Sequence, residues 1–281
     1  MRPLPLPPLA CSDVFSTCLN AITEPAFRAR LHAIGANIAA TAADYDARAN
    51  AATLNLMPRV TSVGSVTKEE LIGLYSDHLS APKGAARSVY DHLRNAAPNR
   101  RCPLCGIGTV AVLDHHLPKA KYPNLSIIPA NLVPTCHFCN NTKRASYPKS
   151  AGEQTLHPYY DTRLLTTQWV KATLDPGPPP VVVYSASPPS SWSAVDQQRV
   201  KRHFKVCGLA TTFTSNANDE LMPLKARLSM LDACGGPSVV QNYLEEQAIC
   251  YAARPNSWQF TMYQALMVDA WFVGGGFNSI S

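Results

Sequence analysis

Residues 102–144 decide the fold, and they read CPLCGIGTVAVLDHHLPKAKYPNLSIIPANLVPTCHFCNNTKR. The stretch contains two Cys-x-x-Cys pairs, Cys102 with Cys105 and Cys136 with Cys139. Two such pairs on tight turns can place four thiolates around one tetrahedral ion, and Zn²⁺ prefers this donor set. Because four protein ligands leave no open position for substrate, we expect a structural zinc ion that holds the segment together.

The remaining cysteines are scattered singly along the chain, at Cys11, Cys18, Cys207, Cys234 and Cys250. This pattern is typical of metal binding in a reducing compartment, not of a disulfide framework, so we expect a cytoplasmic protein. No apolar run approaches the ~18 residues that a membrane span needs, and we expect no membrane partner.

Positive charge is concentrated around the cysteine pairs. The net charge of the 281 residues is only +6, yet eight lysines and arginines and a single acid, Asp114, lie between Arg94 and Lys149. A locally basic surface suits a polyanion such as nucleic acid. A solvated basic face fits the same count equally well.

The residues before the first cysteine pair are expected to be helical. Apolar positions at three- and four-residue spacing predict a long amphipathic helix over 23–56. Thr67 and Glu70 form a capping-box pattern that begins a helix at 67–79, and a further helix is expected at 85–97, before Pro98.

Within the decisive stretch the expected order is strand, strand, helix. Short β-rich runs occupy 109–113 and 125–128, and a helix is expected to follow Cys139. After residue 150 we expect a hairpin of 168–174 with 181–184 and a Pro/Ser linker at 187–193. The C-terminal helices are expected at 193–207, 216–233, 238–253 and 258–272.

The sequences LDHHLPK and CNNTK combine groups suited to phosphodiester hydrolysis. That reaction needs a base to deprotonate water and a cation to neutralise charge on the phosphate and the leaving oxygen. Imidazole is a base near neutral pH, while carboxylate and amide oxygens suit a hard ion such as Mg²⁺. Asp114, a neighbouring histidine, and Asn140 or Asn141 could supply this set.

Residues 102–144 resemble the Cys-x-x-Cys branch of the HNH nuclease superfamily, which has a ββα-metal, treble-clef-like fold. The matching motif positions are Asp114, His115, Pro118, Asn131, Leu132, Cys136, Cys139, Asn140 and Lys143. The resemblance implies that Asp114 and Asn140 bind a catalytic Mg²⁺ or similar divalent ion. It also implies that His115 activates the water and that Asn131 braces the loop orienting His115.

Two positions are ambiguous in register, because His116 and Asn141 each neighbour the preferred residue. The His-x-x-Pro spacing favours His115, and adjacent side chains on a strand face opposite ways, so we expect His116 to pack or to contact substrate. Candidate phosphate contacts are Lys119, Lys121, Lys143 and Arg144.

At lower specificity, DHHLPK, YPNLSIIPANLVP and LHPYYD resemble full-length bacterial HNH proteins of anti-phage and restriction systems, including the Septu type. That resemblance implies an antiviral effector with an ATPase or another defence-system protein as partner. His157, within LHPYYD, is expected to be a structural histidine beside aromatic residues.

The expected fold is therefore mainly α with a small α+β core, in four parts. These are an N-terminal helical region (1–98), an HNH ββα-metal module (99–150), a small β appendage with a linker (151–190) and a C-terminal helical region (191–281). The expected function is a metal-dependent endonuclease, with DNA as the favoured substrate. The alternatives are an RNA-directed nuclease and a non-catalytic zinc module that binds nucleic acid or protein.

Overall fold

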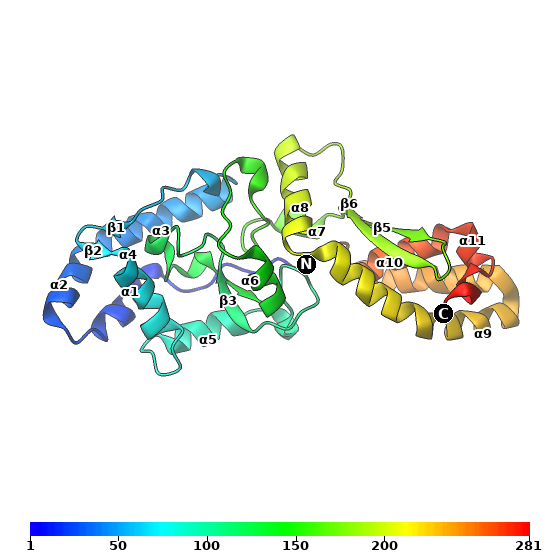
Figure 1. Ribbon diagram of the computed structural model, residues 1–281, viewed down its shortest axis with the longest axis horizontal. Coiled ribbons are helices and arrows are strands. Elements are labelled where there is room, and N and C mark those ends of the chain that lie inside the picture. Colours follow the sequence, from blue (N-terminus) through cyan, green and yellow to red (C-terminus); the bar gives the residue numbers. More distant parts are fainter. The chain divides into compact units, whose positions relative to one another are not determined.

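The structure is a computed structural model that describes residues 1–281 (Figure 1). It divides into two compact units, one of Arg2–Thr162 and one of Arg163–Ser281 together with Met1. The chain is mainly helical and has three separate two-stranded antiparallel sheets, which confirms the expected mainly α fold with small β elements. The two expected parts 1–98 and 99–150 lie, from Arg2 onward, within the same unit.

Helices dominate the first unit up to residue 100. Its elements are α1 (Cys11–Asn20), α2 (Pro25–Ala33), α3 (Gly35–Asn50), η1 (Leu54–Leu56), β1 (Ser62–Val63), β2 (Val66–Thr67), α4 (Lys68–Gly73), η2 (Leu74–Leu79), α5 (Arg87–Asn95) and η3 (Pro98–Arg100). The expected single helix at 23–56 is wrong, because the chain leaves helical geometry at Ile34 (φ −98°, ψ 1°). Ile34 is buried at this break, and Gly35, a weak helix former, follows it.

The expected helix at 67–79 is present with its capping box. The Thr67 side chain accepts from the Glu70 N–H, and the Glu70 carboxylate accepts from the Thr67 N–H. From Leu74 the helix continues as the π-helical segment η2. Such segments are rare and often lie at functional sites. In this chain η2 carries Tyr75, whose ring packs against the His115 ring of β3.

The β, β, α order is present, although the first strand lies at 112–115 and not at 109–113. Strand β3 (Val112–His115) pairs antiparallel with β4 (Leu132–Thr135), and α6 (His137–Lys143) follows directly. Asp114 lies opposite Val133, and His115 lies opposite Leu132. The register therefore places both candidate catalytic residues at the end of β3.

The strand expected at 125–128 is wrong. That segment belongs to a buried loop with two short 3₁₀ turns, η4 (Pro123–Leu125) and η5 (Pro129–Asn131). Its apolar side chains, including Ile127 and Ile128, are buried without strand pairing. The second strand instead begins at Leu132 and contains Pro134.

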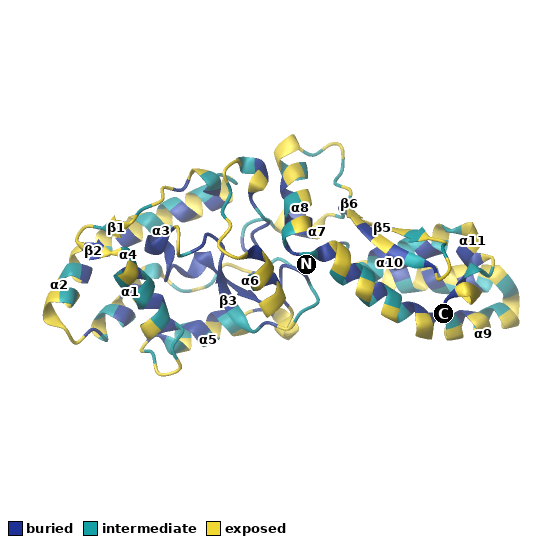
Figure 2. Cartoon of the chain, viewed as in Figure 1, coloured by how far each residue is buried: buried dark blue, intermediate teal, exposed yellow.

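One apolar core joins the N-terminal helices to the ββα segment. It contains side chains from α1 to α5 and also Leu113, Ile127 and Leu132. Figure 2 shows part of β3 in the colour of buried residues, and Leu113, Asp114 and His115 are its buried residues. Because the core is shared, the helices fix the position of β3. The unit ends with η6 (Ala151–Glu153) and the residues up to Thr162.

The second unit consists of a β-hairpin and helices. Its elements are α7 (Thr162–Thr166), β5 (Val170–Asp175), β6 (Val181–Ala186), α8 (Ala194–Val206), α9 (Leu209–Tyr251), α10 (Trp258–Val268), α11 (Ala270–Val273) and η7 (Gly276–Ser279). The expected hairpin and the helix at 193–207 are confirmed. The helices expected at 216–233 and 238–253 are both present as the two parts of α9, which the non-helical geometry of Gly236 (φ 71°, ψ −164°) separates before Pro237. No helix combines the length and apolarity needed to cross a membrane.

Candidate functional site

The two Cys-x-x-Cys pairs form a single buried cluster. The ligand atoms of Cys102, Cys105, Cys136 and Cys139 all lie within 4.8 Å of one another. Sulfurs that share a tetrahedral zinc ion at about 2.3 Å would lie about 3.8 Å apart. The Sγ atoms of Cys105 and Cys136 lie 3.9 Å apart. The four residues therefore have the donor type, burial and spacing of a zinc site.

Two glycines allow the first pair to form its turn. Gly106 has a φ of 76°, a conformation that side chains disfavour, and its N–H donates to the Cys102 carbonyl at 2.8 Å. A Cβ atom on Gly108 would lie 2.7 Å from both the Cβ and the Sγ of Cys136. Glycine at position 108 thus permits the close approach of the two pairs.

Hydrogen bonds within the cluster lower the pKa of Cys105 and Cys136 and raise the pKa of Cys102. The Gly108 N–H donates to Cys105 Sγ at 3.3 Å, and the Cys139 N–H donates to Cys136 Sγ at 3.5 Å. Hydrogen bonds from the Cys102, Cys136 and Cys139 thiols, and from the Gly108 N–H, hold the pKa of Cys105 well below its ordinary value. Thiolate is the form of cysteine that binds metal.

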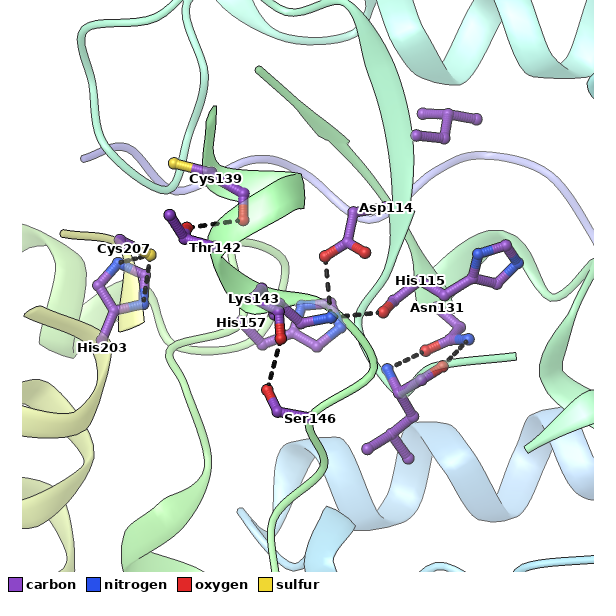
Figure 3. A network of polar contacts seen from close by, with 12 residues as sticks. Asp114, His115, Asn131, Cys139, Thr142, Lys143, Ser146, His157, His203 and Cys207 are labelled. Atoms are coloured by element: carbon purple, nitrogen blue, oxygen red, sulfur yellow. Dashed lines mark hydrogen bonds and ion pairs between the residues drawn. The ribbon is translucent and has the colours of Figure 1, made fainter. Parts of the chain in front are cut away.

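Asp114 is a buried carboxylate paired with a lysine. Its Oδ2 lies 2.9 Å from Lys143 Nζ, and the same ammonium donates to the His115 carbonyl oxygen at 2.7 Å (Figure 3). Burial raises the pKa of Asp114, while the charge and hydrogen bond of Lys143 lower it. Lys143 is 5% exposed, so the structure places it inside the site and not on the surface where a phosphate contact was expected.

His115 lies on the other side of β3 from the Asp114 carboxylate (Figure 3). Its Nε2 lies 2.8 Å from the Ser126 carbonyl oxygen, and the centroid of its ring lies 4.5 Å from that of Tyr75. A carbonyl only accepts, so Nε2 carries the proton and Nδ1 carries the lone pair. Burial lowers the pKa of His115 to about 3, and the imidazole is neutral near pH 7.

Asn131 fastens both ends of the loop that follows β3. Its Oδ1 accepts from the Leu117 N–H at 2.8 Å, and its Nδ2 donates to the carbonyls of Leu117 at 3.1 Å and Leu125 at 3.2 Å. Asn131 is fully buried. The side chain therefore acts through the backbone that carries His115 and Ser126, and does not face an opening.

His116 is buried beside His157, with ring centroids 4.1 Å apart. His157 Nε2 lies 3.0 Å from the Tyr45 hydroxyl, and His157 Nδ1 accepts from the Tyr159 N–H at 3.3 Å. His157 is thus the structural histidine among aromatic residues that the sequence suggested. His116 packs against it, which matches the packing alternative for His116.

The C-terminal end of α6 borders a second part of the candidate site. Asn140, Asn141 and Arg144 line a hollow of about 480 Å³. Asn140 is half-buried and Asn141 exposed, and neither forms a hydrogen bond with Asp114. Arg144 is exposed and has a φ of 51° with ψ of −145°, a conformation that is essentially confined to glycine and stores strain.

The remaining expected phosphate contacts differ in their surroundings. Lys119 is partly buried, with its ammonium 4.4 Å from the Tyr75 ring centroid, and burial lowers its pKa. Lys121 is exposed and lines a different hollow. Lys119 therefore contacts the Tyr75 ring, whereas Lys121 lines a separate hollow.

Comparison with known proteins gives one clear relative. The chain is 31% identical to Protein ea31 of Escherichia phage lambda over 225 residues, which cover 75% of this chain and 76% of that protein. The chain belongs to the ea31 family. No protein-family model matches the ea31-like chain, and no solved structure matches it.

In this member of the ea31 family, the structure brings Asp114, Lys143 and the His115 backbone together. Asn140 lies about one helical turn before Lys143 in α6. Sequence reasoning missed the contact of Tyr75 with His115. The only sequence signal for it is the capping box at Thr67, which fixes the start of the helix but not its π-helical continuation.

Proposed function

We propose that the chain is a metal-dependent endonuclease of the HNH type, with DNA as the favoured substrate. The observation that carries the proposal is the placement of Asp114 and His115 at the end of β3, in a ββα unit whose two cysteine pairs converge on one cluster. This arrangement agrees with the composite motif match in the sequence.

His115 is proposed as the general base. A base must be unprotonated at the working pH, and burial keeps this imidazole neutral. The Ser126 carbonyl fixes which ring nitrogen holds the proton, and Asn131 ties the Ser126 loop to the end of β3. The hydrogen bond between Nε2 and the Ser126 carbonyl thus leaves Nδ1 as the nitrogen with the lone pair. In catalytic histidines, the hydrogen bond at one ring nitrogen commonly sets the role of the other in this way.

Asp114 is proposed as the protein carboxylate that holds Mg²⁺ or a similar ion, with Asn140 supplying an amide oxygen. The donor chemistry fits a hard ion. Such an ion would neutralise negative charge on the phosphate and the leaving oxygen. In the structure Asp114 Oδ2 is paired with the Lys143 ammonium at 2.9 Å, so a metal ion would replace this ammonium as the counter-charge of the carboxylate.

Zn²⁺ is proposed as the ion held by Cys102, Cys105, Cys136 and Cys139, in a structural role. The pairs lie on either side of β3 and β4 in the sequence, so the ion would close the loop that contains His115 and Asn131. Zinc content can be measured after Cys136→Ser, with Cys250→Ser as control because Cys250 is exposed. Unchanged zinc in Cys136→Ser would contradict the four-cysteine site.

The nuclease proposal is tested with the purified full-length chain, plasmid DNA and a long RNA, in Mg²⁺ and in Mn²⁺. We expect wild type to cut, with 5′-phosphate and 3′-hydroxyl ends, and His115→Ala to lose cutting by at least about a hundredfold. His92→Ala is the matched control, since His92 is an exposed histidine of α5. Equal cutting by wild type and His115→Ala, or no cutting of either nucleic acid, would refute the proposal. Cutting of RNA alone would move the substrate class from DNA to RNA.

A further inference from the structure

A hollow of about 480 Å³ lies on the first unit, and neither Asp114 nor Lys143 lines it. It is lined by Arg59, Val60, Thr61, Lys68, Ala120 and Lys121. Half of these side chains are cations, and no acidic residue is among them. No sequence motif groups these residues, because only Ala120 and Lys121 belong to the motif-bearing segment 102–144.

The three cations converge from separate segments. Arg59 lies between η1 and β1, Lys68 is the first residue of α4, and Lys121 lies in the loop after β3. None of the three forms an ion pair with a carboxylate. Four other arginines of the same unit do form ion pairs: Arg30, Arg48, Arg87 and Arg94. The positive charge of the hollow is therefore not neutralised by the protein, and a concave surface concentrates such a field.

Arg59 is held in place by an aromatic side chain. Its guanidinium donates to the Tyr147 hydroxyl at 2.9 Å and lies 5.1 Å from the centroid of the Tyr147 ring. A guanidinium has five N–H donors, so this one bond leaves several donors for an anion. Anchoring also lowers the entropy lost when the side chain binds a ligand.

The hollow and the proposed base border the same short loop. Lys121 follows Lys119 by two residues, a separation of at most about 7 Å along the chain. The Lys119 ammonium lies over the Tyr75 ring, and that ring packs against His115. Successive phosphates of one DNA strand rise by about 3.4 Å along the helix axis, so a strand at His115 would place further phosphates near this loop.

We propose that the hollow of Arg59, Lys68 and Lys121 binds a backbone phosphate of nucleic acid next to the phosphate that is cut. The identity of the ligand rests on the proposed nuclease function. The binding itself needs no catalysis, because charge and N–H donors supply it. The hollow would then set the position of the strand relative to His115, without reading its sequence.

The test measures binding separately from cutting. A short fluorescein-labelled DNA duplex is titrated with full-length His115→Ala protein at several salt concentrations, and anisotropy gives Kd. The hollow variant adds Arg59→Gln, Lys68→Gln and Lys121→Gln. The charge-matched control adds Lys83→Gln, Lys171→Gln and Lys201→Gln, which replace exposed lysines outside the hollow. Thermal unfolding of both variants checks folding, and Lys121→Glu alone is a milder second variant.

We expect the hollow variant to bind more weakly and to lose about 1 unit of the slope of log K against log salt, since the one phosphate bound in the hollow contributes about 0.9. The control should keep its slope within a few tenths of a unit, and Lys121→Glu should lose about one unit. Three results would each overturn the proposal. They are an equal loss of slope in the hollow variant and the control, an unchanged slope in the hollow variant, and no duplex binding by the His115→Ala parent at low salt.

The two proposals fail in distinguishable ways. If wild type cuts no nucleic acid but the hollow variant loses duplex affinity and the control does not, the hollow stands and the nuclease proposal falls. In the opposite case, wild type cuts and His115→Ala does not, while the hollow variant and the control bind duplex with equal affinity. The nuclease proposal is then supported, and the proposal of phosphate binding in the hollow is refuted.

Discussion

Replacing Asn131 by alanine removes the side chain that ties the loop after β3 together. Three hydrogen bonds are lost, to the Leu117 N–H, the Leu117 carbonyl and the Leu125 carbonyl. The Leu125 carbonyl keeps a second donor, the Ile128 N–H at 3.4 Å. The two polar groups of Leu117 lose the Asn131 partner, and Leu117 itself is fully buried.

The expected destabilisation follows from those two groups. A buried donor or acceptor left without a partner costs about 1–3 kcal/mol, so Asn131→Ala should lower the free energy of unfolding by about 2–6 kcal/mol. A typical domain has only about 5–15 kcal/mol in total. The substitution should therefore remove a large share of the stability of the first unit.

Asn124 in the same loop provides a matched control. It is also an asparagine and is only 6% exposed, but its Oδ1 has no hydrogen-bond partner. Asn124→Ala removes an oxygen whose burial is already unfavourable, so we expect a change within about 1 kcal/mol. The comparison separates the hydrogen bonds of Asn131 from the general effect of shortening a buried amide.

The assay is urea unfolding followed by far-ultraviolet circular dichroism, with tryptophan fluorescence as an internal reference. All four tryptophans lie in the second unit, at Trp169, Trp192, Trp258 and Trp271, so their fluorescence follows that unit. The dichroism transition of the first unit should move to lower urea in Asn131→Ala and stay in place in Asn124→Ala. Equal shifts in both variants would refute the bracing role of Asn131.

Three further predictions concern the same unit. Gly108→Ala should lower the zinc content and the melting temperature, because the added Cβ would lie 2.7 Å from Cys136. The control Gly177→Ala should change neither quantity, because the nearest atom to its added Cβ would be 3.6 Å away. Equal melting temperatures for the two variants would count against the close approach of Gly108 to Cys136. Alkylation of the native protein, read by mass spectrometry, should modify the exposed Cys234 and Cys250. After a chelator removes the metal, the alkylated residues should also include Cys102, Cys105, Cys136 and Cys139. Labelling of these four cysteines before chelation would argue against a bound ion. Tyr75→Phe should keep the rate of DNA cutting within a few-fold of wild type, because the ring that packs against His115 remains. Tyr75→Leu removes this ring and should cut about tenfold to a hundredfold more slowly. Equal rates for the two variants would exclude a positioning role for the ring.

Local chemistry made part of the structure predictable. The Cys-x-x-Cys spacing indicated the cluster of Cys102, Cys105, Cys136 and Cys139, and it is confirmed as a compact buried group. The capping box at Thr67 and the hairpin of β5 with β6 were equally visible, because each depends on residues close together in the sequence.

Features that depend on distant residues were not predictable. The apolar run 125–128 indicates burial but not strand pairing, and its loop is held by the side chain of Asn131. Pro134 obscured the true second strand, since proline is unusual within strands. The pairing of Lys143 with Asp114 joins α6 to β3, and no local pattern announces it.

One apolar core contains side chains of α1 to α5 together with Leu113, Ile127 and Leu132. This shared core limits where recombination between related genes can produce a folded protein. A recombination breakpoint near residue 98 would leave each half without part of its interior, so the segment 99–150 could not be inherited as a portable cassette. A breakpoint between Thr162 and Arg163 would instead separate two units that each keep their own internal packing. Exchange among genes of this family should therefore leave hybrid junctions near Thr162 far more often than inside Arg2–Thr162.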